Sequence, residues 1–112
     1  MSDSLVVVWT SGDREVAKNM VFMYTLNAKK RRWFDEVTLV VWGPSDELLL
    51  QDHELQSSVK EMIAEGITVE ACLRCAENYN AVEPLKQLGI DVKLMGIPLS
   101  DYLKEGRKVL TF

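Results

Sequence analysis

Short apolar runs alternate along this chain with longer stretches of helical periodicity, and this alternation constrains the fold more than any other feature. The first run, Leu5–Trp9, is continuously apolar, as expected for a strand buried on both faces of a sheet. Repeated strand–helix units favour a mostly parallel sheet with helices on both faces. We therefore expect an α/β fold with a five-stranded sheet, whose other strands are Val37–Trp42, Ile67–Ala71, Asp91–Met95 and Lys108–Phe112.

The connecting segments carry the spacing of amphipathic helices. From Arg14 to Lys30, apolar residues recur at a helical period. We expect Met20, Met23 and Phe22 to pack in the core rather than to bind a cofactor. The buried face of this helix is expected to hold Val16, Ala17, Met20, Met23, Tyr24 and Ala28. Further helices are expected at Ser45–Leu50, about His53 to Glu65, Leu73–Leu88 and Ser100–Glu105, with Gly66 and Gly89 as stops.

Length and charge limit the classes of function. A chain of 112 residues predicts a single domain over residues 1–112. A formal net charge of −4 argues against direct binding of nucleic acid, since phosphates require a basic face. No stretch approaches the roughly 20 apolar residues that span a bilayer, and Met1–Ser4 lacks the character of a signal peptide. We expect a cytoplasmic protein with no membrane partner.

The two cysteines, Cys72 and Cys75, form a C-x-x-C motif at the end of the third expected strand. Cys75 falls in the first turn of the next helix, where a helix N-terminus can lower a thiol pKa. Because structural disulfides are rare in the cytosol, the pair indicates redox chemistry, sulfur chemistry or metal binding. Loops that follow parallel strands share the edge where ligands bind, so we expect four loops there: Thr10–Asp13, Trp42–Ser45, Cys72–Cys75 and Gly96–Pro98.

Metal binding is the weakest of these three options. Structural zinc needs four ligands, and the cysteines supply two. The only histidine, His53, begins a helix before the third strand, and we expect it at the opposite edge of the sheet. We therefore expect no metal and no other cofactor in a monomer, although a zinc site shared between subunits stays open.

Several charged and aromatic residues surround the motif in sequence. A carboxylate at Glu70 or Glu77 would raise a thiol pKa and Arg74 would lower it, and the sequence leaves this balance open. Compensation of helix dipoles accounts for acidic residues at helix starts. Trp9 and Trp42 end buried strands beside the motif, and packing in the core or at an interface is their expected role, with a wall of the thiol pocket as the alternative for one of them. The acidic residues at helix starts are Asp46, Glu47, Asp52 and Glu54.

At this point the sequence resembles a known family, the small DsrE-like proteins with their sulfur-relay (TusD) and YchN-like branches. The resemblance covers nearly the whole chain. Its most specific parts are G-x-x-V-x-x-C, from Gly66 to Cys72, and the terminal Lys-Val-Leu-Thr-Phe. The continuation to Cys75 is similar to the YchN-like branch. The resemblance implies a three-layer α/β/α sandwich, a homo- or hetero-oligomeric assembly that is commonly a trimer or hexamer, and a persulfide on Cys72. For this chain we expect a homo-oligomer.

The expected function is that of a sulfur-relay protein, a sulfurtransferase that exchanges sulfane sulfur with donor and acceptor proteins. Cys72 would carry the persulfide, and Cys75 would resolve it or accept the sulfur. Two alternatives stay open: a dithiol oxidoreductase that uses the C-x-x-C pair, and a non-catalytic oligomeric or small-ligand module with packed cysteines. Leu48, Leu49, Leu50 and Tyr102 are the expected exposed apolar residues that favour an oligomer.

Overall fold

The sheet has five parallel strands in the order β4-β3-β2-β1-β5. The computed structural model describes residues 3–112. The expected α/β fold is confirmed, with a sheet that is wholly rather than mostly parallel. The strands are β1 (Ser4–Trp9), β2 (Glu36–Val41), β3 (Thr68–Cys72), β4 (Asp91–Lys93) and β5 (Lys108–Thr111).

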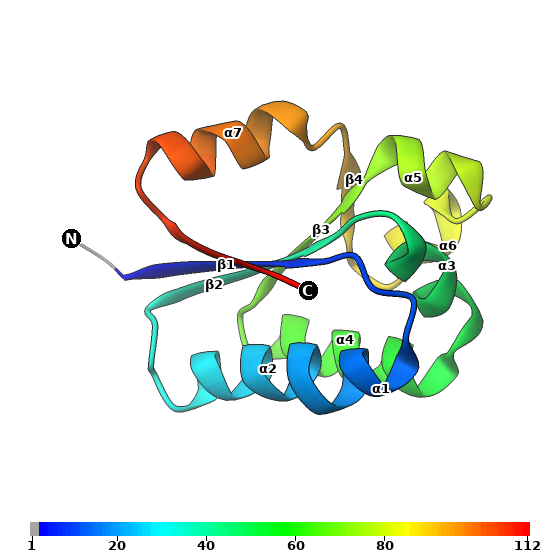
Figure 1. The fold of residues 1–112 in the computed structure, drawn as a ribbon. Helices are drawn as coiled ribbons and strands as arrows, with labels where there is room; N and C mark the ends of the chain where they lie inside the picture. The colour runs from blue at the N-terminus through cyan, green and yellow to red at the C-terminus, as the bar shows by residue number, and fades with distance from the viewer. Residues whose placement is uncertain (1–2) are drawn as a thin grey trace.

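Helices cover both faces of this sheet, as Figure 1 shows. The first long helix and α4 lie on one face, called here the α4 face, and α7 lies on the other, called the α7 face. α3, α5 and α6 gather beyond the carboxyl ends of the strands, at the right of the view. The helices are α1 (Arg14–Val16), η1 (Ala17–Phe22), α2 (Met23–Lys30), α3 (Pro44–Gln51), α4 (His53–Ala64), α5 (Leu73–Asn78), α6 (Val82–Gln87) and α7 (Gly96–Lys104).

The two faces of the sheet are packed unequally. Side chains alternate along each strand, so β1 sends Leu5, Val7 and Trp9 into the large core of the α4 face. The core of the α7 face is small and consists of Val6, Val8, Val40, Cys72 and Met95, and no residue of α7 itself is fully buried. The third strand therefore places Cys72 under the thinner cover.

The first helix buries a different face from the one expected. α1, η1 and α2 are continuous, but the middle segment η1 is π-helical. A π turn is wider than an α turn and rotates the later residues around the axis. The expectation that Met20 and Met23 pack in the core was wrong, because they are 39 % and 56 % exposed. The buried residues are Ala17, Val21, Phe22, Thr25 and Ala28.

The helix expected from Leu73 to Leu88 is two helices. α5 ends at Asn78, and Asn80 takes a positive φ of 55°, a conformation that asparagine tolerates. The N–H of Ala81 bonds to the carbonyl of Ala76 at 2.8 Å, as in a Schellman cap. α6 then begins in a new direction. The break keeps α5, with Cys75, short and close to the sheet edge.

The last helix begins earlier than expected, at Gly96 rather than Ser100. Pro98 lies in its first turn, where a backbone N–H has no partner within the helix, so proline is tolerated there. The early start shortens β4, which ends at Lys93. α7 consequently begins directly beside the carboxyl ends of the strands.

The expected set of exposed apolar residues was also wrong. Leu49 is fully buried, and Leu48, Leu50 and Tyr102 are half-buried against the two cores. The large apolar side chains on the surface lie mainly on the first helix and around α7. They are Val16, Met20, Met23, Trp33, Leu94, Ile97, Leu103 and Leu110.

Candidate functional site

Cys72 is the last residue of β3 and the N-cap of α5. The alternation of β3 turns Val69 and Ala71 into the core of the α4 face and turns Cys72 to the α7 face. Its side chain is 6 % exposed and lies in the cluster that contains Met95. A thiol at this position is at the carboxyl edge of the sheet and is shielded from bulk solvent.

Cys75 lies in the first turn of α5, half-buried, and packs against the cluster that contains Cys72. Burial raises the pKa of Cys75 to about 11, and the neighbouring Cys72 thiol adds to the effect. The backbone N–H of Gly43 acts in the opposite direction, and the charges of Cys72 and Asp46 raise the pKa further. The expectation that the helix start lowers the thiol pKa is therefore wrong for Cys75, and this thiol stays protonated near neutral pH.

A further ionisable group near this place is Asp46, in the first turn of α3. Its side chain is fully buried, and neither carboxylate oxygen accepts a hydrogen bond from the described residues, 3–112. Burial raises the pKa of Asp46 to about 7. The N–H groups of Gly43 and Asp46 itself lie close enough to offset part of that rise, without a well-aligned hydrogen bond.

Asp46 is the residue that sequence reasoning missed. Its place at a helix start suggested simple compensation of the helix dipole, which needs a solvated side chain. The available signal was the segment Gly43-Pro44-Ser45-Asp46, which bends directly after a buried strand at the carboxyl edge. Gly43 there has a φ of 87°, in the region that favours glycine.

Ser45 fastens this loop to the end of β1. Its hydroxyl donates a 2.5 Å hydrogen bond to the carbonyl of Trp9, and its backbone N–H bonds to the carbonyl of Thr10. Thr10 in turn donates from its N–H and its hydroxyl to the carbonyl of Phe112. The loops after β1 and β2 therefore meet at one edge with the end of the chain, as the topology predicted.

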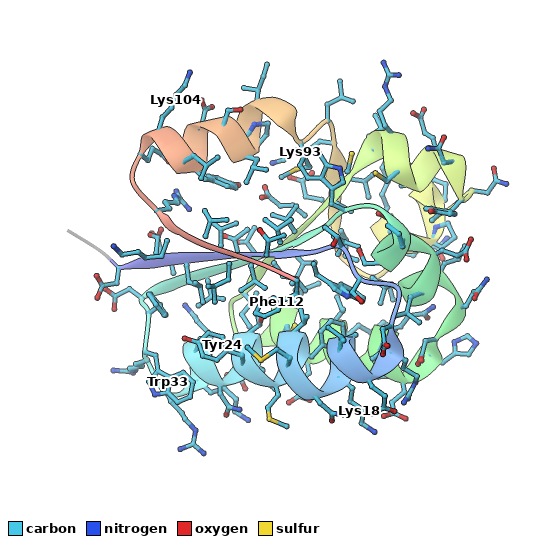
Figure 2. All side chains as sticks on the ribbon, viewed as in Figure 1. Lys18, Tyr24, Trp33, Lys93, Lys104 and Phe112 are labelled. Carbon is cyan, nitrogen blue, oxygen red and sulfur yellow. The ribbon has the colours of Figure 1, made fainter. Side chains whose placement is uncertain are left out.

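The charged residues that flank the cysteines in sequence do not act on Cys75. Arg74 and Glu77 are exposed. Glu70 is buried in β3 and is fully paired, because the Tyr102 hydroxyl donates to it at 2.5 Å and Lys93 lies 2.6 Å from it. In Figure 2, Lys93 lies beneath the first turn of α7. Glu70 thus holds α7 to the sheet.

The tryptophans separate onto the two faces. Trp9 is fully buried in the core of the α4 face, where its ring meets Phe22 edge-on at 4.9 Å. Trp42 is half-buried and packs against the cluster of Cys72, so Trp42 is the aromatic wall on the cysteine side.

The expectation that His53 lies at the edge of the sheet opposite the cysteines was wrong. The preceding residue, Asp52, is bonded at 2.6 Å to Arg14, which begins the helix after β1. Because α4 runs back toward the amino edge, its first residue lies toward the carboxyl edge. His53 is exposed, and the part of the chain that the structure describes has no group of three or more His, Cys, Asp and Glu placed to hold a metal.

One hollow of the surface lies away from the cysteines, at the amino edge of the sheet. It is placed between the start of β1 and the start of β5, where Asp3, Glu36 and Arg107 line it. Within residues 3–112, no helix has the length and apolar character to cross a membrane.

Comparison with known proteins identifies the family. The model of the DsrE/DsrF-like family matches residues 3–112. The chain belongs to this family. A conserved protein of unknown function from Bacteroides thetaiotaomicron resembles this DsrE/DsrF-like chain at 41 % identity and a TM-score of 0.94, with 98 % of this chain and 95 % of that one covered.

Two further solved structures share the DsrE/DsrF-like fold at low identity. The YchN protein of E. coli is 14 % identical with a TM-score of 0.68, and both chains are covered fully. A protein of unknown function from Methanobacterium thermoautotrophicum is 18 % identical with a TM-score of 0.71, with 98 % and 99 % covered. No curated protein matches the chain. Family membership suggests a role in sulfur relay in general.

Proposed function

We propose that this DsrE/DsrF-like protein carries sulfane sulfur as a persulfide on Cys72, with Cys75 as its exchange partner. The observation that carries the proposal is that Cys72, at the end of β3, and Cys75, in the first turn of α5, lie next to each other at the carboxyl edge of the sheet. Since Cys75 is held protonated, Cys72 is the candidate nucleophile of the pair. This assignment makes the protein a sulfurtransferase of the carrier type.

The chemistry requires no cofactor. The thiolate of Cys72 attacks the outer sulfur of a donor persulfide, R–S–SH, and the bond between the two donor sulfurs breaks. Cys72–S–SH forms, and the electron pair leaves on the donor as R–S⁻. The exchange follows the logic of thiol–disulfide exchange and involves no net oxidation. With Cys72 only 6 % exposed, the loaded sulfur is protected from unrelated thiols.

The partners follow from this reaction. A donor protein with a persulfide and an acceptor protein with a thiol are needed, and a reducing cytosol keeps Cys72 and Cys75 free of a structural disulfide. A homo-oligomer, such as a trimer or hexamer, is part of the proposal. The exposed apolar side chains around α7 and on the first helix support this assembly, because monomeric proteins in solution rarely expose large apolar patches.

The test is intact-protein mass spectrometry under non-reducing conditions, after incubation with a cysteine desulfurase and cysteine. The wild type, Cys72→Ser and Cys75→Ser are compared. We expect a mass gain of one sulfur in the wild type and in Cys75→Ser, reversed by reductant, and no gain in Cys72→Ser. Equal loading of Cys72→Ser and wild type would remove Cys72 as the carrier.

A dithiol oxidoreductase is the second candidate, because Cys72 and Cys75 are neighbours in a C-x-x-C motif that spans the start of α5. In that case the wild type would gain no sulfur and would lose two hydrogens on mild oxidation. A protein that shows neither change would be a module in which both cysteines are packing residues.

A further inference from the structure

A second hollow lies at the amino edge of the sheet, opposite the edge that holds the cysteines. Its walls are the end of α2, the starts of β2 and β3, α7 and the loop before β5. In Figure 1 this edge is at the left, where the end of α2 and the end of α7 lie on opposite faces of the sheet. The hollow has a volume of about 360 Å³, and ligand pockets range from about 300 to 1,000 Å³. It is therefore large enough to hold a small ligand.

The wall of this hollow contains a buried hydroxyl without a protein partner. Thr38 of β2 is 5 % exposed, and its hydroxyl makes no hydrogen bond within residues 3–112. The oxygen is not sealed from solvent, so it faces the hollow that Thr38 lines. Thr68 of β3 stands beside Thr38 in the register of the two strands and lines the same hollow. Because buried polar groups are almost always bonded, the Thr38 hydroxyl points to a ligand in the hollow.

The first of two cations in this hollow is Lys29, at the end of α2. Its ammonium donates a 3.0 Å hydrogen bond to the backbone carbonyl of Asp35, and it forms no ion pair within the described part of the chain. Gly66 gives the side chain its room, because a Cβ at Gly66 would lie 3.3 Å from the Cε of Lys29. The position of Lys29 is therefore fixed while its positive charge stays uncompensated.

The second cation is Arg107, before β5. Its guanidinium lies 4.7 Å from the centre of the Tyr102 ring, and its Nε lies 3.3 Å from the exposed carboxylate of Glu105. The lining of the hollow also includes Glu36, which accepts a 3.0 Å hydrogen bond from the hydroxyl of Ser4. Two positive charges thus line the hollow against one negative charge. In a protein of net charge −4, a hollow of this kind attracts anions.

We propose that this hollow binds a small tetrahedral oxyanion, phosphate or sulfate. Lys29 and Arg107 supply charge-assisted hydrogen bonds to its oxygens, and the hydroxyls of Thr38 and Thr68 donate to it. A valine at position 38 would pack in the strand as well as threonine does, so packing does not account for the hydroxyl. The inference goes beyond the proposed function, because the site lies at the opposite edge of the sheet from Cys72.

The test is equilibrium dialysis of the full chain at pH 7 and constant ionic strength, with radiolabelled inorganic phosphate in one arm and radiolabelled sulfate in the other. We expect saturable binding of one ion per chain, with a Kd of about 1 mM or tighter for at least one of the two anions. The anion with the lower Kd identifies the class of ligand. Uptake that does not saturate with either anion would overturn the inference.

Two pairs of variants place the anion in this hollow. Thr38→Val keeps the shape of the side chain and removes the donor, and Thr111→Val changes an exposed threonine of β5 as its control. Lys29→Gln removes one positive charge, and Lys104→Gln removes one from α7, where Figure 2 shows the side chain pointing away from the sheet. We expect Thr38→Val and Lys29→Gln each to raise the Kd about tenfold, and each control to change it less than about twofold.

Stability and charge effects are separated from binding in the same experiment. Because the Thr38 hydroxyl has no partner within residues 3–112, Thr38→Val should keep the urea midpoint of the wild type, and its weaker binding then reflects the lost donor. Equal losses of affinity in Lys29→Gln and Lys104→Gln would show a general attraction of the surface and would overturn the site. Sulfur loading of Cys72 plays no part in these measurements, so the inference and the proposed function fail separately.

Discussion

The hydroxyl of Tyr102 donates a 2.5 Å hydrogen bond to the buried carboxylate of Glu70, and this contact fastens α7 over the face that holds Cys72. Burial, followed by the bond to Glu70, raises the pKa of Tyr102 to about 12, so the donor stays protonated over the physiological range. The guanidinium of Arg107 lies 4.7 Å from the centre of the Tyr102 ring. α7, which covers the face with Cys72, is thus held by polar contacts in addition to the small apolar core of the α7 face.

Tyr102→Phe removes the hydroxyl and leaves one lone pair of a buried carboxylate without a donor. We expect the free energy of unfolding to fall by about 1 to 2 kcal/mol. Urea denaturation followed by circular dichroism measures the loss. Tyr79→Phe is the matched control, because the Tyr79 hydroxyl makes no hydrogen bond to the described residues. A loss of the same size in both variants would show that Tyr102 acts through packing alone.

Lys93→Met leaves the carboxylate of Glu70 without its cation. Bonds to Asp91 and Glu70 raise the pKa of Lys93, so the ion pair stabilises the fold at neutral pH, and on the alkaline side Lys93 loses its charge only in strong alkali. Since Lys93 is partly exposed, we expect a loss of about 2 kcal/mol at pH 7 rather than the full cost of a broken buried pair. Lys86→Met, which removes only an exposed 4.0 Å pair with Glu83, should cost far less.

Asp46 should make the stability of the protein depend on pH. The pKa of Asp46 is about 7 in the folded protein, and its ordinary value, which applies to the unfolded chain, is 3.8. The folded state therefore binds the proton more tightly than the unfolded chain. The contribution of Asp46 to stability is therefore fully present below about pH 4 and is lost as the pH rises to about 7, by roughly 2 to 4 kcal/mol. In Asp46→Asn this fall should vanish, whereas Glu47→Gln should retain it. Urea midpoints at pH 5 and pH 8 provide the comparison.

The proposed oligomer should depend on the apolar surface around α7. Ile97 is 76 % exposed and lies close to Met95, which packs on Cys72. Ile97→Lys should shift the assembly toward monomers in sedimentation velocity at micromolar concentration. Asp101→Lys, an exposed change on the same helix, should leave the assembly unchanged. An unaltered assembly in Ile97→Lys would move the interface to another surface, such as the first helix.

The strands were predictable because strands that are buried on both faces of a sheet consist of continuous runs of apolar residues. The run of Leu5–Trp9 and the stop at Gly66 are local signals, and the structure follows both. The buried face of the first helix was not predictable by period alone. The π turn around Met20 changes the phase of the helix, and no residue type marks such a turn.

The candidate site was predictable only in part for a related reason. Cys72 and Cys75 stand at a strand end and a helix start, which local sequence reveals. The burial of Asp46 depends on the packing of α3 against α5. Glu70 is bonded to Lys93 of the neighbouring strand β4 and to Tyr102 of α7. Tertiary contacts of this kind leave no trace in spacing, so helix-start compensation was the wrong interpretation of Asp46.

The most direct test of the central claim is to locate the added sulfur on one cysteine. Cys75→Ser is loaded with a cysteine desulfurase and cysteine, alkylated, digested and sequenced by tandem mass spectrometry. We predict one additional sulfur on the peptide that contains Cys72, which reductant removes before alkylation. A loaded protein in which the Cys72 peptide carries no additional sulfur would contradict the account.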